Sequence, residues 1–356
     1  MCVRLSETER AHDAFPAIVR IKTGFSPFAM NIKRSFLQIT MKILALLLCF
    51  VMILGGCTAA DGNSTETSDQ AAGTAEYQIT DAFGNTASLS RDSRIVSCYG
   101  SFADCLQLSG IEPVGVTDDA VKEHGLSFSE DVKIIGTVKE INLELLCECD
   151  PDYVILSADL AAHIKLEDSL KALGFEYGYF RVDTFSDYAS FMESLCAVSG
   201  RDDLYRENVA LPKENIENIL SKIPSDQGAE VLLMRAYSSG IKAKGDDNLA
   251  GQILKELGAS NIVDRYPSML EDLSLEQIIN DDPEFIFVSF MGSEDAAKEY
   301  LQDNFEKSPS FASLSAVKNS NYILLPKDLF HYKPNNRWDE SYEYLAKILY
   351  PEVFGQ

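Results

Sequence analysis

The chain has 356 residues, of which 46% are hydrophobic and 24% are charged, and its formal net charge at pH 7 is −24. This composition indicates a globular protein, and the length is sufficient for two lobes of ordinary domain size. The strongly acidic balance argues against a nucleic-acid partner and against binding to anionic membrane patches.

An apolar segment precedes a cysteine near residue 57. Residues 43–54 read ILALLLCFVMIL and follow Lys42. The run is shorter than the about 20 residues of a spanning helix, and its basic flank is typical of a signal peptide. The run ends in LGGC, which resembles the lipobox of bacterial lipoproteins, whose cysteine is acylated and becomes the mature N-terminus. Cys57 is therefore predicted to anchor the protein by lipid on the extracytoplasmic face of the cell membrane. The alternative is a short buried helix followed by an ordinary cysteine.

This signal peptide, residues 41–56, divides the N-terminal part of the chain. Residues 1–40 lack periodicity and form a doubtful extension, because translation from Met30 or Met41 would place the signal peptide at the N-terminus. Residues 57–76 are rich in Ser, Thr, Gly and Ala and are predicted to form a flexible tether. Residues 1–56 hold seven basic and three acidic residues, so the remainder carries a net charge of −28.

Five further cysteines follow the tether. Their odd number and irregular spacing do not fit a disulfide framework, and one C-x-C pair without a second pair is at most half a metal site. We expect these cysteines to be buried in the core as small apolar residues. They are Cys98, Cys105, Cys147, Cys149 and Cys196.

The folded part is predicted to begin near residue 77. Two short strands flank a Gly/Asn turn at residues 81–85, and residues 94–97 form the next strand. A helix over 101–108 and a strand over 113–116 follow. Strand, helix and strand at this spacing indicate an α/β layer with parallel strands.

An internal repeat organises the rest of the chain. Residues 143–157 align without gaps to residues 275–289, and each copy reads as a short helix, an Asp-Pro break and a buried strand. Two related lobes are predicted, over 77–185 and 228–356. Between them, residues 186–227 show helical spacing interrupted by Gly200 and Pro212, and predict a linker helix.

These segments resemble the substrate-binding proteins of ABC importers, in the iron-siderophore, haem and cobalamin class. The matching signatures are DAFGNTASLSRDSRIVS, SGIEPVGV, NLELLCECDPDYVILS and GQILKELGASNIVD. The resemblance implies an α/β fold of two Rossmann-like lobes with mostly parallel sheets, joined by a long α-helix, and a ligand in the cleft between them. It also implies a binding protein without a cofactor, whose partner is an ABC permease dimer with its ATPase.

The resemblance assigns a role to one glutamate in each copy of the repeat. In the family, a glutamate at the top of each lobe docks onto arginines of the permease, and the matching positions here are Glu144 and Glu276. The alternative is that both carboxylates stabilise helix N-termini through the macrodipole.

Ligands of open α/β lobes bind beyond the carboxyl ends of the strands. Aromatic side chains there would offer a flat surface, and fixed cations would bind the anionic oxygens of a ferric siderophore. The alternative for the arginines is pairing with local acids such as Asp339 and Glu340. The candidate ligand-binding residues are Tyr99, Lys139, Arg235, Tyr237, His331, Tyr332 and Arg337.

Other functions remain open at this point. His331 and Tyr332 are residue types that ligate haem iron, so a haem or corrinoid receptor is the alternative within the same class. A zinc or manganese receptor would use the three histidines beyond residue 57, although no His-rich loop is present. An extracytoplasmic sensor or enzyme is a further alternative, but the chain contains no G-x-S-x-G, H-E-x-x-H or phosphate-loop motif.

Overall fold

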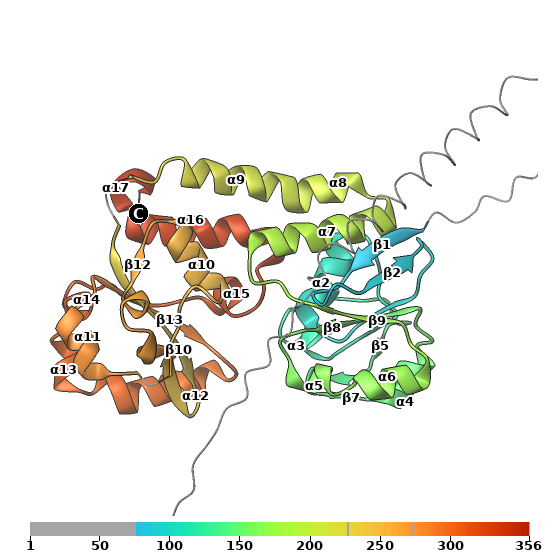
Figure 1. Cartoon of the computed structure of the whole chain (residues 1–356), viewed down its shortest axis with the longest axis horizontal. Helices are drawn as coiled ribbons and strands as arrows, with labels where there is room; N and C mark the ends of the chain where they lie inside the picture. The colour runs from blue at the N-terminus through green and yellow to red at the C-terminus, as the bar shows by residue number, and fades with distance from the viewer. Residues whose placement is uncertain (1–75, 226–227, 272, 356) are drawn as a thin grey trace, which may run out of the picture. The chain divides into compact units, whose positions relative to one another are not determined.

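The computed structural model describes residues 76–225, 228–271 and 273–355, which all belong to one compact unit. These residues form two α/β lobes, each built around its own sheet (Figure 1). The predicted signal peptide, Cys57 and the tether up to residue 75 lie outside the described residues. Within the described part, no helix is both long and apolar enough to cross a membrane.

The N-terminal lobe (N-lobe) contains a parallel sheet with the strand order β5-β4-β3-β8-β9. Strands β3, β4 and β8 are short and fully buried, as parallel strands covered by helices are, whereas the edge strand β5 is partly exposed. Two small hairpins, β1-β2 and β6-β7, accompany the sheet. The strands are β1 (Tyr77–Thr80), β2 (Thr86–Leu89), β3 (Ile95–Ser97), β4 (Gly115–Val116), β5 (Lys133–Ile134), β6 (Gly136–Thr137), β7 (Glu140–Ile141), β8 (Tyr153–Ser157) and β9 (Tyr177–Phe180). The helices are α2 (Gly100–Leu108), α3 (Asp119–Lys122), α4 (Leu143–Glu148), α5 (Ala161–Ile164), α6 (Glu167–Leu173) and α7 (Phe185–Ser199).

The C-terminal lobe (C-lobe) has the strand order β11-β10-β13-β14, with β12 also paired to β10. The edge strand β11 is antiparallel, and the other pairings are parallel. The strands are β10 (Glu230–Tyr237), β11 (Gly240–Ala243), β12 (Ser260–Asn261), β13 (Phe285–Phe290) and β14 (Tyr322–Leu324). The helices are α10 (Leu249–Glu256), η3 (Ile262–Asp264), η4 (Pro267–Leu270), α11 (Leu275–Asp281), α12 (Glu294–Leu301), η5 (Gln302–Glu306), α13 (Pro309–Ala312), α14 (Ser315–Lys318), α15 (Lys327–Phe330), η6 (Asn335–Arg337), α16 (Trp338–Leu349) and α17 (Pro351–Phe354).

The repeat is present in the backbone. Helix α4 begins at Leu143 and strand β8 at Tyr153, while α11 begins at Leu275 and β13 at Phe285, 132 residues later in both cases. The aspartate before each proline, Asp150 in one copy and Asp282 in the other, has φ of +45°. A left-handed aspartate thus ends each helix, and the following proline directs the chain into a strand. The predicted mixed α/β fold with two lobes is confirmed.

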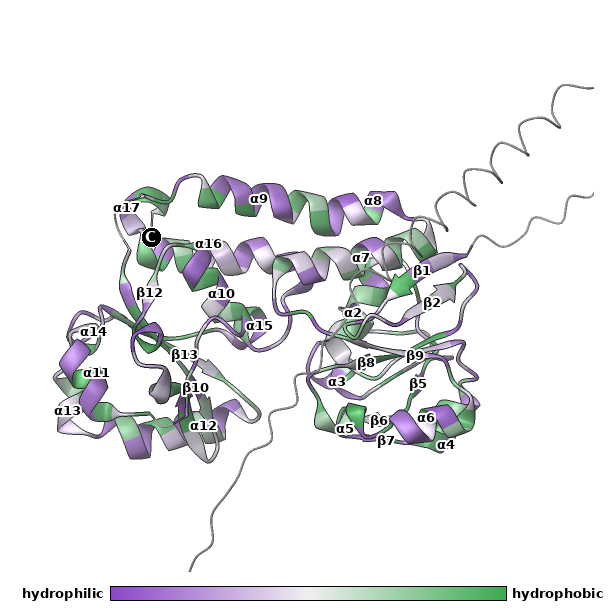
Figure 2. Cartoon of the chain, viewed as in Figure 1, coloured by the Kyte–Doolittle hydropathy of each residue, from purple (hydrophilic) through white to green (hydrophobic). Residues whose placement is uncertain are grey.

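The predicted linker helix is divided in the structure. Helix α7 ends at Ser199, and Gly200 with φ of +68° caps it. Helix α7 packs against β1 and α2 of the N-lobe. The segment that crosses between the lobes comprises α8 (Asp202–Tyr205), the π-helical turn η2 (Arg206–Ala210) and α9 (Leu211–Leu220). Helix α9 then packs along α16. Figure 2 shows α9 banded by hydrophilic and hydrophobic residues, as an amphipathic helix is.

Pro212 explains the π-helical turn in the crossing segment. A proline inside a helix cannot bond the carbonyl four residues earlier and clashes with it. Here the Leu211 N–H donates to Arg206 O instead, and the carbonyl of Asn208 accepts a hydrogen bond of 3.0 Å from the Tyr188 hydroxyl. The turn therefore lets one helix pass the proline while the freed carbonyl keeps a partner.

The apolar core runs from one lobe into the other. One cluster of buried residues includes Tyr153 and Ile155 of β8, Val231 and Leu233 of β10, and Trp338 of α16. The opposite faces of the two sheets form separate clusters. Among the five cysteines, four are buried as predicted, whereas Cys147 is exposed.

Candidate functional site

A cleft of about 310 Å³ lies where the two lobes face one another. Its N-lobe wall includes Tyr99, Ser157 and Asp159, and its C-lobe wall includes Arg235 and Met291. Ser157 is the last residue of β8, Arg235 lies near the end of β10, and Met291 follows β13. The cleft therefore lies at the carboxyl ends of the strands, as the sequence predicts for an α/β ligand site.

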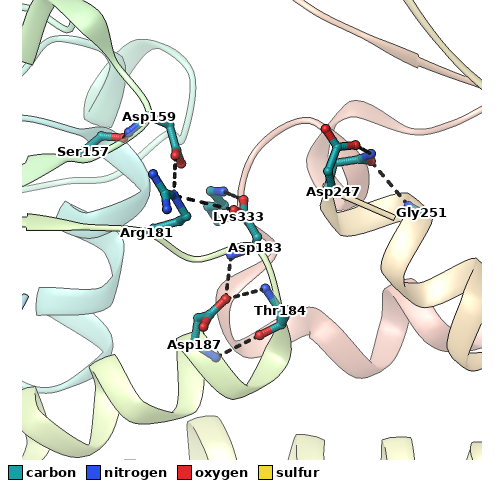
Figure 3. Close-up of polar contacts among 10 residues, drawn as sticks. Ser157, Asp159, Arg181, Asp183, Thr184, Asp187, Asp247, Gly251 and Lys333 are labelled. Carbon is teal, nitrogen blue, oxygen red and sulfur yellow. Dashed lines mark hydrogen bonds and ion pairs between the residues drawn. The ribbon is translucent and has the colours of Figure 1, made fainter. Parts of the chain in front are cut away.

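The cleft also contains ion pairs that sequence reasoning missed. Lys244 Nζ lies 3.1 Å from Asp247 Oδ2 within the C-lobe. Lys333 Nζ lies 3.1 Å from Asp183 Oδ1, and this pair joins the two lobes (Figure 3). Asp159 and Asp183 come shortly after β8 and β9, so the rule that ligands bind beyond strand ends could have identified them.

Arg235 differs from the other cations of the cleft. Its Nε is 3.4 Å from the Ser289 hydroxyl. In the described ranges no carboxylate lies within 4.0 Å of its guanidinium, so the predicted alternative of local pairing does not apply to it. A cation without an acidic partner in a cleft can bind an anionic ligand without first losing an ion pair.

His331 lies in the cleft as an uncharged imidazole. Burial, together with the neighbouring cations Lys327 and Arg235, lowers the pKa of His331 to about 4. Its ring centroid lies 4.9 Å from that of Tyr332, which in turn lies 4.8 Å from the ring of His124 in the N-lobe. The three rings thus form an aromatic contact between the lobes beside the cleft.

The remaining histidine of the described chain is structural. His163 Nδ1 accepts the Ser157 N–H at 2.9 Å, so Nε2 carries the proton and donates to Val138 O at 2.9 Å. Both ring nitrogens are therefore occupied in holding the β6-β7 hairpin against the end of β8. Across residues 76–225, 228–271 and 273–355, no group of three or more His, Cys, Asp or Glu side chains could hold a metal ion.

Three of the predicted ligand-binding residues lie outside the lining of this cleft. Lys139 is exposed in the turn between β6 and β7, and Tyr237 ends β10. Arg337 lies 3.0 Å from Asp328 and 2.8 Å from Glu340, which matches the predicted alternative of local pairing. Ligand contact by these three residues stays a prediction, whereas Tyr99, Arg235, His331 and Tyr332 do line the cleft.

Glu144 and Glu276 occupy matching positions on the two lobes. Each is the second residue of its helix, and each helix begins with a side-chain cap, Asn142 for α4 and Ser274 for α11. Both glutamates are exposed, and neither has an ion pair within the described ranges. The N-terminal position fits the macrodipole explanation, while the exposed, unpaired carboxylates remain available to a cationic partner.

Comparison with known proteins places this geometry in context. The model of the periplasmic binding protein family matches residues 95–329. The Fe(3+)-citrate-binding protein YfmC of Bacillus subtilis is 25% identical over 331 residues, which cover 91% of this chain and 100% of YfmC. The putative ABC transporter substrate-binding lipoprotein YhfQ of the same organism is 24% identical and covers 79% of this chain and 88% of its own. The structure of S. aureus IsdE complexed with heme superposes with a TM-score of 0.61 at 18% identity, covering 73% of this chain and 99% of IsdE.

Proposed function

Because the chain belongs to the periplasmic binding protein family, we propose that it is the extracytoplasmic receptor of an ABC importer for a ferric complex. The ligand would bind in the cleft between the lobes, and the loaded receptor would deliver it to a permease dimer driven by an ATPase. Family membership supports a role as a substrate-binding transport protein rather than as an enzyme.

The observation that carries this proposal is the unpaired Arg235 in the cleft. Ferric siderophores and ferric citrate present anionic oxygens, and a guanidinium binds such groups through charge-assisted hydrogen bonds. The relative YfmC is named for binding Fe(3+)-citrate. The cleft volume of about 310 Å³ is at the lower end of the range of about 300–1,000 Å³ for small-molecule sites. A compact ferric chelate therefore suits it better than a larger ring system.

Haem is the second candidate within the class, because a neutral His331 lies in the cleft next to Tyr332. An uncharged imidazole can ligate iron without first losing a proton. A haem titration tests this directly, since axial ligation by His331 would shift the Soret band and His331→Ala would abolish the shift. Absence of a shift in the unsubstituted protein would eliminate the haem candidate.

The proposal includes attachment to the membrane and docking to the permease. The LGGC motif at Cys57 supports a lipid anchor, and the relative YhfQ is named as a lipoprotein. The exposed carboxylates of Glu144 and Glu276 support docking, because one unpaired acid on each lobe can pair with fixed cations on a two-fold partner.

The test is calorimetric titration of the purified protein with ferric citrate, a catecholate siderophore complex, a hydroxamate siderophore complex, haem and cobalamin. We expect an anionic ferric complex to bind, and Arg235→Ala to weaken its binding about 10- to 100-fold through loss of charge-assisted hydrogen bonds. Arg206→Ala is the matched control, because Arg206 is exposed on the crossing helix. Equal affinities of wild type and Arg235→Ala would contradict the proposed ligand chemistry.

A further inference from the structure

Four charged side chains form a chain of ion pairs at the cleft, which we call the ion chain. Asp159 Oδ1 lies 2.6 Å from Arg181 Nε, which lies 3.9 Å from Asp183 Oδ2, and Asp183 Oδ1 lies 3.1 Å from Lys333 Nζ. Figure 3 shows these four residues, with dashed lines for the contacts between successive members. The charges along the ion chain alternate in sign, and only its last ion pair, Asp183 with Lys333, joins the two lobes.

Asp183 therefore has a cation on each side, one from its own lobe and one from the other. Its backbone is fixed, because Asp187 Oδ2 accepts hydrogen bonds from Asp183 N at 3.1 Å and Thr184 N at 2.9 Å in the capping box of α7. If Lys333 turns away, the carboxylate of Asp183 still has Arg181. This second partner lowers the cost of releasing Lys333, because Asp183 is not left as an unpaired charge.

Lys333 can turn without moving the loop that carries it. The loop is attached to the N-lobe independently, since Asn335 Nδ2 donates to Ser101 O at 2.9 Å and to Asp104 Oδ2 at 2.7 Å. The ring contact of Tyr332 with His124 adds a second attachment. The side chain of Lys333 is 16% exposed, so its pair with Asp183 is screened less by solvent than a surface pair is.

We propose that Asp183 is a specificity-determining residue that makes the cleft select ligands by their negative charge. In the ligand-free cleft the carboxylate of Asp183 neutralises the ammonium group of Lys333. A ligand binds this ammonium group only when it attracts it more strongly than the single carboxylate of Asp183 does. This inference rests on the proposed function and names the feature of a ferric complex that the site recognises.

The charges that line the cleft support this selection. They comprise three cations, Arg235, Lys244 and Lys333, and three carboxylates, Asp159, Asp183 and Asp247, while His331 is uncharged. The lining is therefore neutral as a whole, and a singly charged ligand meets little net attraction. A polyanionic chelate can form ion pairs with both Arg235 and Lys333. A neutral chelate gains no binding free energy when Lys333 leaves Asp183.

The test is a double-mutant cycle on Asp183 and Lys333, with ferric citrate as the anionic probe and a neutral ferric trihydroxamate as the uncharged probe. We expect Asp183→Asn to bind ferric citrate about 5-fold more tightly, because the competing carboxylate is removed. Lys333→Met, which keeps the side-chain length, should bind it about 5-fold more weakly. Adding Asp183→Asn to Lys333→Met should give less than a 2-fold change, because no ammonium group remains to be released.

The cycle separates local competition from a general change in charge. The proposal would be overturned if Asp183→Asn raised the affinity for ferric citrate equally in the presence and absence of Lys333. It would also be overturned if Asp183→Asn raised the affinity for the neutral ferric trihydroxamate. Thermal unfolding and circular dichroism of each variant verify that it is folded. If ferric citrate binds and Arg235→Ala weakens it while Asp183→Asn has no effect, the proposed function stands and this inference fails. If no anionic complex binds the unsubstituted protein, the proposed function itself fails.

Discussion

The two lobes present different side chains at matching backbone positions of the cleft. Ser157 ends β8 and Ser289 lies near the end of β13, 132 residues later. In the C-lobe, Arg235 lies opposite Ser289 in the β10-β13 pairing. In the N-lobe the β3-β8 pairing ends at Ser97 and Ile155, and Tyr99 and Ser157 each come two residues later. The same position therefore holds an aromatic ring in one lobe and a cation in the other.

A second matching pair shows the same divergence. Asp159 of the N-lobe corresponds to Met291 of the C-lobe by the repeat offset, and both line the cleft. The C-lobe contributes all three cations of the lining, and the N-lobe contributes two of its three carboxylates. The repeat thus keeps the backbone that forms the cleft, while the side chains that line the cleft differ between the lobes. By contrast, the exposed glutamates Glu144 and Glu276 remained alike.

The largest expected effect tests that preserved pair. Reversing both charges, Glu144→Arg with Glu276→Arg, should reduce uptake of the ferric complex by cells at least tenfold, because like charges would then face the permease. Affinity in solution should stay unchanged, because both residues lie outside the cleft lining. Uptake is measured with radioactive iron, and affinity by calorimetry.

The single variants sharpen the comparison between the lobes. If docking uses both lobes equally, Glu144→Arg and Glu276→Arg alone should each reduce uptake by a similar factor. Charge reversal at Glu217, an exposed residue of α9, is the control and should leave uptake unchanged. Normal uptake by the double variant would refute the docking role and leave the macrodipole explanation.

His331 of the C-lobe is expected to make the stability of the protein depend on pH. Burial depresses the pKa of His331 to about 4, below its ordinary value of 6.5. The folded state then binds fewer protons than the unfolded state between these values. Stability present above pH 6.5 is therefore lost as the pH falls toward 4. We expect this loss to be about 2 kcal/mol and to disappear in His331→Asn. Urea unfolding at a series of pH values measures it.

His163 provides the internal reference for this experiment. Burial also lowers the pKa of His163, so its contribution has the same sign and persists in His331→Asn. The difference between the two proteins reports the loss of His331 together with its effect on the neighbouring His124, whose pKa burial also lowers. Parallel pH profiles of wild type and His331→Asn would show that the cleft histidine does not contribute.

The repeated segments were predictable because their signals are local. An Asp-Pro dipeptide between a helical pattern and an apolar run defines a helix end and a strand start, and both copies have those boundaries in the structure. Ligands of α/β lobes bind beyond the carboxyl ends of the strands, where side chains gather at one edge of the sheet. This rule predicts Tyr99, Arg235, His331 and Tyr332 as residues of the cleft, and all four line it.

The contacts between the lobes were not predictable from local pattern. Asp183 and Lys333 are 150 residues apart, and nothing near either residue indicates its partner. Arg337 follows a strand in the sequence, which predicts a place near the cleft, but the sequence does not show that Asp328 as well as Glu340 pairs with it. The interruptions of the linker at Gly200 and Pro212 are visible in the sequence, but their outcomes differ. The left-handed Gly200 separates α7 from α8, whereas the π-helical turn η2 lets the helix continue past Pro212.

The smallest expected effect compares the two left-handed aspartates. Asp282 accepts hydrogen bonds from Ser315 N at 2.7 Å and from the Ser315 hydroxyl at 2.6 Å. Asp150 has the same φ of +45°, but its carboxylate has no hydrogen bond or ion pair in the described ranges. Replacement by glycine relieves the strain of the left-handed conformation at both sites. Only at Asp282 does it also remove side-chain hydrogen bonds.

Asp150→Gly should therefore unfold with a free energy within about 0.5 kcal/mol of wild type, while Asp282→Gly should lose about 1 kcal/mol. Asp282→Asn should recover part of that loss, because asparagine tolerates the left-handed conformation and keeps an acceptor for Ser315. Equilibrium denaturation in urea measures all three variants. If both glycine variants changed stability equally, the hydrogen bonds to Ser315 would contribute nothing. The two copies of the repeat would then be equivalent in energy as well as in backbone.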